Sequence, residues 1–207
     1  MARPEPTLQT EREYFASGAR IVAGMDEVGR GAIAGPVTIG IVAIDSRVGP
    51  IPEGLRDSKL MTAKRREAMV PLAQAWSVAW ATGSATATEI DVYGIVTALG
   101  LAASRALQAL PVAPDVVILD GNTKFLVEEE NGPRVVTRIK ADQDCACASA
   151  ASVIAKVERD ALMTNLHLQF PQYGWAGNKG YGAKVHTDAI KAHGLTDFHR
   201  KSWNLGV

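Results

Sequence analysis

The chain has few of the residues that would place it outside the cell or in a membrane. Its only cysteines are Cys145 and Cys147. Their two-residue spacing on a predicted helix directs the side chains to different faces, so we expect free thiols in a reducing cytoplasm rather than a disulfide. No apolar run reaches about 18 residues, the length of a membrane-spanning helix. The N-terminal stretch also lacks the apolar segment of a signal peptide, so we predict a cytoplasmic protein.

An excess of charge of one sign is also missing. The 22 Lys+Arg residues balance the 22 Asp+Glu residues, and the net charge is zero at pH 7. A globally basic nucleic-acid binder is therefore excluded, and any such site must be a local patch. The apolar fraction of 47% suffices for a sizeable core, and 207 residues fit a single domain. We expect an N-terminal extension with a short helix over about residues 1–19 and a small C-terminal segment over about residues 171–207.

Hydrophobic periodicity predicts a meander of strands, followed by strands that alternate with helices. Strands are expected at residues 20–25, 34–44, 74–82, 116–119 and 135–139. Helices are expected at residues 10–18, 62–73, 86–110, 143–170 and 183–193, with capping-box spacing at Thr10–Glu13 and Thr86–Glu89. The first two strands would form an antiparallel hairpin with a wide, glycine-rich connection. This order predicts an α/β domain with a mixed sheet covered by helices.

Three aspartates follow apolar, strand-like runs. Asp26, Asp120 and Asp142 each fall at or near the C-terminal end of such a run. Sites in open α/β sheets gather where strand ends converge, and three carboxylates there repel one another unless they are protonated or bridged by cations. Oxygen-only ligands favour Mg²⁺ or Mn²⁺. Taken singly, Asp120 could instead belong to an ordinary turn and Asp142 to a helix N-cap.

Glu27 directly follows Asp26, and this adjacency creates a geometric problem. Neighbouring residues in a regular strand point to opposite faces. The two acids can therefore serve one site only if the strand breaks or bulges there, which Gly24 and Gly29 would permit. Otherwise Glu27 is a surface carboxylate on the opposite side.

Gly29, Arg30 and Gly31 come next. They are either a simple hairpin turn or a place where a nucleic-acid backbone approaches closely, because glycine has no side chain to obstruct it. In the second case main-chain groups could bond a ribose hydroxyl while Arg30 meets a phosphate.

The C-terminal part is locally basic. Residues 178–201 hold Lys179, Lys184, Lys191, Arg200 and Lys201, together with His186, His193 and His199, against Asp188 and Asp197. This stretch is either a solvated helix face or a flank that contacts phosphates. His186 is expected on an apolar side or at a helix cap, and Trp175 and Trp203 in the core. Lys156 and Arg159 either face substrate or pair with surface acids.

Seven motifs occur in a fixed order between residues 23 and 203. They are DEVGRG, DSKL, DGN, a KxD before AASVIAKVERD, FPQYG, KGY and HRKSW. This combination resembles type 2 ribonuclease H, the ribonuclease HII family. The resemblance implies an endonuclease that hydrolyses RNA in RNA–DNA hybrids and incises 5′ of single ribonucleotides in duplex DNA. It also implies a ribonuclease-H-like fold, in which a central five-stranded mixed sheet is flanked by helices and followed by a small helical C-terminal segment that binds substrate.

The resemblance also implies a set of site residues. The catalytic and metal-binding acids would be Asp26, Glu27, Asp120 and Asp142. The residues that read the ribonucleotide-to-DNA junction would be Gly29, Arg30, Gly31 and Tyr181, and Ser58 and Lys59 match phosphate-contacting positions. Two Mg²⁺ or Mn²⁺ ions roughly 3.5–4 Å apart would activate a water and stabilise the leaving 3′ oxygen. Telling RNA from DNA then rests on the 2′-hydroxyl.

Three other functions fit parts of the sequence. A DNA-junction resolvase would share the acids, but its chemistry needs no 2′-hydroxyl and hence neither the glycine-arginine-glycine motif nor Tyr181. A non-catalytic nucleic-acid-binding module would gain nothing from acids clustered near phosphates. A structural metal protein would favour a closed site over exchangeable oxygen ligands. Of these functions we favour the ribonuclease. Its expected partners are RNA–DNA hybrids and ribonucleotide-containing DNA, with no membrane partner, and we expect a monomer.

Overall fold

The computed structural model describes residues 5–128 and 130–206. Five strands form one mixed sheet in the order β3-β2-β1-β4-β5. Their bounds are Ile21–Val28 for β1, Val37–Asp45 for β2, Ala79–Ala85 for β3, Val116–Asp120 for β4 and Arg134–Arg138 for β5. The pairs β1–β2 and β2–β3 are antiparallel, whereas β1–β4 and β4–β5 are parallel. The predicted five-stranded mixed sheet and its opening hairpin are confirmed.

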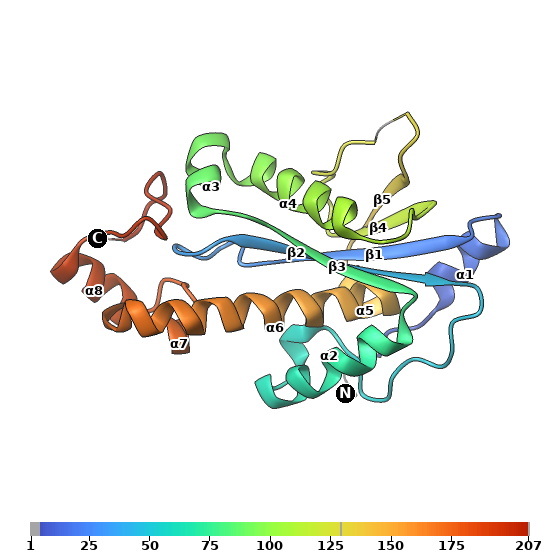
Figure 1. Ribbon diagram of the computed structural model, residues 1–207, viewed down its shortest axis with the longest axis horizontal. Helices are drawn as coiled ribbons and strands as arrows, with labels where there is room; N and C mark the ends of the chain where they lie inside the picture. The colour runs from blue at the N-terminus through green and yellow to red at the C-terminus, as the bar shows by residue number, and fades with distance from the viewer. Residues whose placement is uncertain (1–4, 129, 207) are drawn as a thin grey trace.

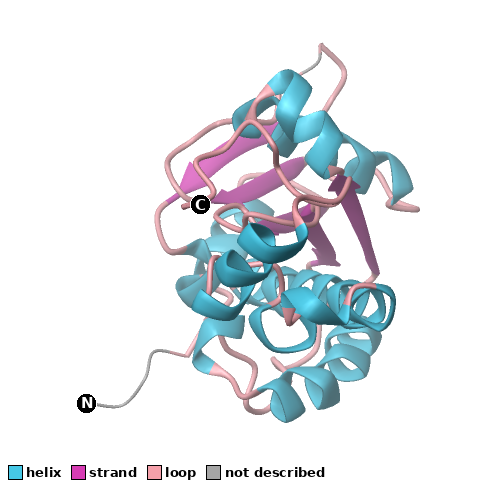
Figure 2. Ribbon diagram, turned by 90° about the vertical axis from the view of Figure 1, so that its left-hand side faces the viewer, coloured by secondary structure: helices cyan, strands magenta, loops and turns pink. Residues whose placement is uncertain are grey.

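Helices cover both faces of this sheet (Figure 1). One face carries α3 (Ala87–Tyr93) and α4 (Ile95–Ala109), and the other carries α2 (Ala63–Trp76) and the long α6 (Ala146–Gln169). Short elements fill the ends: α1 (Gln9–Ala16), η1 (Ser58–Leu60), α5 (Ala141–Asp144), η2 (Pro171–Tyr173), α7 (Trp175–Asn178) and α8 (Lys184–His193). Figure 2 shows the strands lying between a smaller helical layer and a larger one.

Strand alternation divides the core into two apolar clusters. Ala23 and Met25 of β1 pack in the cluster under α4, whereas Val22 packs in the cluster under α6. A third cluster joins the end of α6 to the C-terminal helices and contains Tyr173 and Trp175, as expected for Trp175. The parity of β1 therefore places Asp26, like Val22, on the face covered by α6.

Gly24 allows α6 to lie close against the sheet. A Cβ atom at this position would come within 2.3 Å of the Ala148 main-chain nitrogen. The facing stretch of α6 consists of small residues, including Ala148 and Ala151, which are fully buried. This close approach brings the start of α6, and the short α5 before it, next to the end of β1.

The predicted start of one helix and the predicted bounds of one strand are wrong. The first helix begins at Gln9 with Leu8 as its N-cap and no capping side chain, so Thr10 lies within the helix instead of at its start. The predicted strand at residues 74–82 merges two elements, because α2 continues through Trp76 and β3 begins only at Ala79.

Two predicted long helices are each divided. The Thr86–Glu89 capping box is confirmed, but Gly94, with φ of 77°, separates α3 from α4. The helix predicted at residues 143–170 is interrupted at Cys145, whose extended backbone separates α5 from α6. Cys145 and Cys147 are both buried and free.

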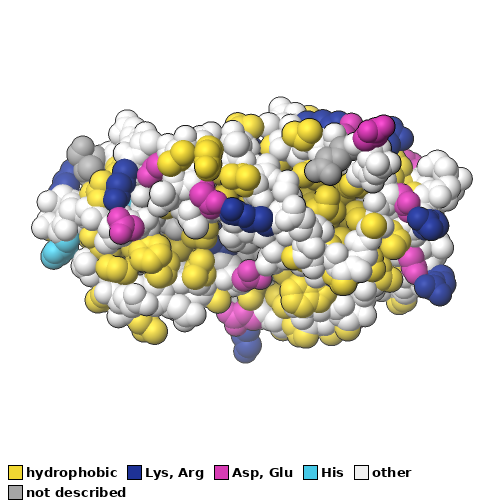
Figure 3. All heavy atoms as spheres, turned by 45° about the horizontal axis from the view of Figure 1, so that its top comes forward, with side chains coloured by type: hydrophobic (Ala, Val, Ile, Leu, Met, Phe, Trp, Pro, Cys, Tyr) yellow, Lys and Arg dark blue, Asp and Glu magenta, His cyan; other side chains and the backbone are white. Residues whose placement is uncertain are grey.

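The described residues contain no helix that is long and apolar enough to cross a membrane. On the face viewed in Figure 3, basic and acidic side chains are interspersed among apolar patches. This mixture agrees with the balanced charge of the chain, and it leaves any nucleic-acid site to a local arrangement of groups.

Candidate active site

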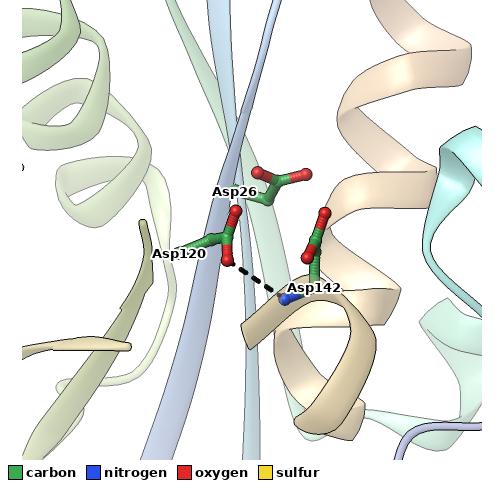
Figure 4. A group of neighbouring side chains, drawn as sticks. All are labelled: Asp26, Asp120 and Asp142. Atoms are coloured by element: carbon green, nitrogen blue, oxygen red, sulfur yellow. Dashed lines mark hydrogen bonds between the residues drawn. The ribbon is translucent and has the colours of Figure 1, made fainter. Parts of the chain in front are cut away.

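The three aspartates converge from separate elements. Asp26 is on β1, Asp120 is the last residue of β4, and Asp142 is in α5 (Figure 4). Each offers a carboxylate oxygen, and these oxygens all lie within 4.8 Å of one another. Asp26 and Asp142 are buried, and Asp120 is half-buried. The predicted meeting of the three acids at the strand ends is confirmed.

Strand register explains why Asp26 and Asp120 meet. The parallel ladder pairs Met25 with Leu119, so the next residues, Asp26 and Asp120, stand level on neighbouring strands. Both project to the face of α6, because each lies an even number of residues from a strand residue packed on that side. The carboxyl ends of two parallel strands therefore deliver two carboxylates to one point.

Asp142 reaches the same point through a sharp change of direction. Lys140 adopts the left-handed conformation, with φ of 63°, and turns the chain from β5 into α5. The Asp142 main-chain N–H then donates to Oδ1 of Asp120 at 3.3 Å, and the Asp142 carbonyl accepts from Ser149 Oγ at 2.6 Å. Asp142 is thus fixed within α5 and does not act as the helix N-cap.

Burial and mutual repulsion destabilise the charged forms of Asp26 and Asp120. Burial raises the pKa of Asp26 well above its ordinary value, and the neighbouring carboxylates of Asp120, Glu27 and Asp142 raise it further against the opposing effect of Lys59. Burial, followed by the charge of Asp142, raises the pKa of Asp120 to about 6. A divalent cation would relieve this repulsion, because oxygen atoms that share a site bind it in place of protons.

Lys59 provides the positive charge that the protein itself offers to the acids. Its Nζ atom lies 3.0 Å from Oδ2 of Asp142. Burial lowers the pKa of Lys59, but the carboxylates of Asp26 and Asp142 outweigh this effect and raise it above its ordinary value. The predicted neighbour Ser58 is buried, and its main-chain N–H donates to Ser152 Oγ.

Asp57 is a site residue that the sequence analysis did not single out. It is 1% exposed, and its Oδ1 atom accepts from the Lys59 main-chain N–H at 2.9 Å. Burial raises the pKa of Asp57, and the nearby Asp142 carboxylate adds to this rise. The signal was present in the DSKL motif, where an aspartate two residues before the lysine suits an N-cap.

Glu27 lies outside the group of three. The β1–β2 ladder continues in register through Asp26–Gly40, Glu27–Ile39 and Val28–Thr38, so the bulge considered from the sequence is absent from this described hairpin. The Glu27 Oε1 atom contacts Arg30 Nη1 at 3.3 Å. The parallel ladder with β4, however, ends at Met25. Glu27 therefore lies on the last part of β1, which pairs with β2 but extends beyond its ladder with β4. From there its charge still raises the pKa values of Asp26 and Asp120.

The structure brings the glycine-arginine-glycine motif and Tyr181 together. Residues 29–36 connect β1 to β2, and we call them the 29–36 loop. The N–H groups of Ile33 and Ala34 both donate to the Gly180 carbonyl, at 2.9 and 3.0 Å. Tyr181 follows directly, is 37% exposed, and its carbonyl faces Nδ1 of the buried His186 at 2.9 Å.

Lys156, Arg159 and His186 are three other side chains for which the sequence analysis made a prediction. Lys156 pairs with Asp160 at 2.7 Å, in agreement with the ion-pair alternative. Arg159 contradicts both alternatives, because it is 1% exposed and donates to three main-chain carbonyls. His186 is fully buried, and its Nε2 atom accepts from Trp175 Nε1 at 3.0 Å.

The five-stranded mixed sheet with helices on both faces, and the acid cluster beside its central strands, agree with the metal-dependent nuclease of the ribonuclease-H-like fold that the sequence resemblance implies. The sequence model of the family Ribonuclease HII matches residues 23–205. A ribonuclease HII of Streptomyces avermitilis is 49% identical over 200 residues, which are 96% of this chain and 83% of that protein. The ribonuclease HII of Paracoccus denitrificans is 44% identical over 198 residues, with 96% and 91% covered.

A crystal structure of ribonuclease H2 from Pyrococcus horikoshii superposes with a TM-score of 0.74 at 25% identity, covering 89% of this chain and 94% of that one. Sequence and fold thus agree along nearly the whole chain. The chain belongs to the ribonuclease HII family of endoribonucleases.

Proposed function

We propose that this enzyme hydrolyses RNA in RNA–DNA hybrids and incises 5′ of single ribonucleotides embedded in duplex DNA, leaving 3′-hydroxyl and 5′-phosphate ends. One observation carries the proposal: Asp26, which meets Asp120 and Asp142 in the acid cluster, lies on β1, the strand that leads directly into the 29–36 loop. A hydrolytic centre and a main-chain surface suited to a ribose are thereby joined by three residues of β1. Family membership supports the same activity.

The acids fit a hard divalent cation. Asp26, Asp120 and Asp142 would hold Mg²⁺ or Mn²⁺, since these ions favour carboxylate oxygens, and burial together with the neighbouring carboxylates raises the pKa values of Asp26 and Asp120. Glu27 is the fourth metal ligand in this proposal. Its side chain would turn away from Arg30 and toward the three aspartates, past the part of β1 that extends beyond the β4 ladder. When bound, two such ions supply water activation and stabilisation of the leaving oxygen.

The chain's own residues orient these groups. Ser149 and the Asp142 main-chain N–H fix the relation between Asp142 and Asp120. Lys59 suits a phosphate, because its ammonium lies at the acids while its side chain is largely exposed. Ser58, which is buried, supports the turn that carries Lys59. Gly29, Arg30 and Gly31 would contact the ribonucleotide, and Tyr181 would pack on the following deoxyribose.

The test offers the enzyme three duplexes in the presence of Mg²⁺ or Mn²⁺: DNA with one ribonucleotide, all-DNA of the same sequence, and a long RNA–DNA hybrid. We expect a single cut 5′ of the ribonucleotide, cleavage of the hybrid and no cleavage of all-DNA. Equal cleavage of all-DNA would support the resolvase alternative. Binding of all three without cleavage would support a non-catalytic module.

We further propose that residues 1–207 act as a single ribonuclease H type 2 domain and as a monomer, removing ribonucleotides from DNA. The two free, buried cysteines support activity in a reducing cytoplasm. The C-terminal segment from about residue 171 supports substrate binding because it holds Tyr181 against the 29–36 loop.

A further inference from the structure

Two arginines are buried near the 29–36 loop. Arg159 on α6 and Arg200 near the C-terminus are 1% and 0% exposed. A buried charge is costly unless hydrogen bonds or an opposite charge stabilise it. Across residues 5–128 and 130–206, neither guanidinium forms an ion pair with a carboxylate, and both donate to main-chain carbonyls instead.

Arg200 gathers the carbonyls at both ends of the loop. Its Nη2 atom donates to the Gly29 carbonyl at 2.6 Å, and its Nη1 atom donates to the Arg30 carbonyl at 2.8 Å. The Gly35 carbonyl accepts from Nε and Nη2 at 3.2 and 3.1 Å. The planar guanidinium thus ties three carbonyls into one cluster, which a single ammonium could not reach.

Arg159 ties the other side of the loop to the Tyr181 segment. It donates to the carbonyls of Pro36 and Ala34 at 2.8 and 3.1 Å, and to the Lys179 carbonyl at 2.8 Å. Its guanidinium also lies 5.7 Å from the centre of the Tyr181 ring. A Cβ atom on Gly29 would come within 2.0 Å of Arg159 Nε, so the position of this arginine requires glycine there.

These bonds determine where the neighbouring N–H groups point. In a trans peptide the C=O and N–H bonds face opposite ways, and the described chain has no cis peptide. Because the Gly29 and Arg30 carbonyls turn toward Arg200, the N–H groups of Arg30 and Gly31 turn away from it. Neither N–H has an acceptor within the described chain. Two adjacent donors are therefore free, with positive charge behind them.

We propose that Arg200 and Arg159 are positioning residues, which preorganise the Arg30 and Gly31 N–H groups as a donor pair for the ribonucleotide and hold this pair in register with Tyr181. The inference rests on the proposed function. Preorganised donors bind an oxygen without the free-energy cost of ordering a loop at the moment of binding. The buried positive charges strengthen the donors, and burial followed by the charge of Arg159 lowers the pKa of Arg200 to about 9.

The test compares Arg200→Lys and Arg159→Lys with Arg105→Lys as a matched control. Arg105 also donates to a main-chain carbonyl, that of Ser84, but it lies on α4. All three changes are made together with Asp120→Asn so that binding is measured without cleavage. We expect the ratio of Kd values for all-DNA and single-ribonucleotide duplexes to fall roughly tenfold for Arg200→Lys and Arg159→Lys, as for loss of one charge-assisted hydrogen bond. Arg105→Lys should leave the ratio unchanged.

Amide hydrogen exchange provides a second readout that does not need substrate. Exchange should accelerate at residues 29–36 and 179–183 in Arg200→Lys, while Leu99→Ala, a substitution of a buried core residue of α4, should leave these segments unchanged relative to the rest of the chain. An unchanged binding ratio with unchanged loop exchange would overturn the proposal. If the parent enzyme itself shows no preference for the ribonucleotide, the proposed function fails, and the exchange result still decides whether the arginines order the loop.

Discussion

The acid cluster and the pair of arginines behind the 29–36 loop each bring like charges together, but the protein stabilises the two groups differently. The guanidiniums of Arg159 and Arg200 donate to carbonyls that their own chain supplies. The carboxylates of Asp26, Asp120 and Asp142 receive few donors, and the pKa values of the first two are raised. A like-charge pair can therefore be structural when main-chain groups solvate it. The acid cluster receives fewer hydrogen bonds from the described chain, and a cation can relieve the remaining repulsion.

Asp120→Asn is the most severe test of this contrast. Cleavage with Mg²⁺ should fall about a thousandfold or more, because one cation ligand is lost. The free energy of unfolding without divalent ions should stay equal or rise, because the variant no longer holds an ionised group whose folded pKa lies above its ordinary value. Cleavage assays and urea unfolding in chelator measure the two effects. Asp45→Asn, at the end of β2 beside Arg47, is the control and should cleave normally. Full activity of Asp120→Asn would refute the site assignment.

The neighbouring histidines His186 and His199 test how burial disfavours charge, through the pH dependence of the unfolding free energy. Burial, with the nearby His186, lowers the pKa of His199 from 6.5 to about 4. Between these values the unfolded chain binds a proton that the folded chain does not, so this residue makes stability fall as pH falls from 6.5 to 4, by up to about 3 kcal/mol. His199→Gln should flatten this part of the profile in urea unfolding. The exposed His193→Gln should not, and an equal change in both would contradict the assignment to His199.

Gly24→Ala probes the close approach that unites the acids. The added methyl group would overlap the Ala148 main chain, so the unfolding free energy should fall by about 1–3 kcal/mol. Because α5 and α6 move with this contact, Mn²⁺ affinity should also fall, as measured by calorimetry. The control is Gly49→Ala, where a Cβ meets open space. Unchanged stability and affinity for Gly24→Ala would show that the sheet and α6 tolerate separation.

Tyr181→Ala should have the smallest and most selective effect. Preference for the single-ribonucleotide duplex, expressed as a ratio of kcat/KM values to those for the long hybrid, should fall about tenfold through loss of ring packing. Mn²⁺ affinity should stay unchanged, since Tyr181 is not among the acids. Tyr181→Phe keeps the ring and should retain the preference. A loss of the same size in Tyr181→Phe would transfer the role from the ring to the hydroxyl.

The sequence was sufficient to predict the sheet and the meeting of three acids, because strand ends are visible as apolar runs that stop at aspartates. It was insufficient for Glu27, since its position depends on where the β4 ladder ends, which is a property of the partner strand. The break at Cys145 depends on contacts with the N-terminal segment, where the Ala146 N–H donates to the Thr7 carbonyl. Arg159 was misjudged because arginine usually marks a surface, whereas here distant carbonyls solvate it.

The unbroken register of β1 has a consequence for where the enzyme would cut. A strand advances about 3.3 Å per residue, so the three steps from Asp26 to Gly29 separate the hydrolytic centre from the ribose-reading loop by about 10 Å. A strand hydrogen-bonded along its length does not stretch, so the distance between the two sites is fixed. Insertion of one residue would lengthen this distance and turn Asp26 to the wrong face. In the proposed function, the offset between a ribonucleotide and its incision is thus encoded as a number of residues.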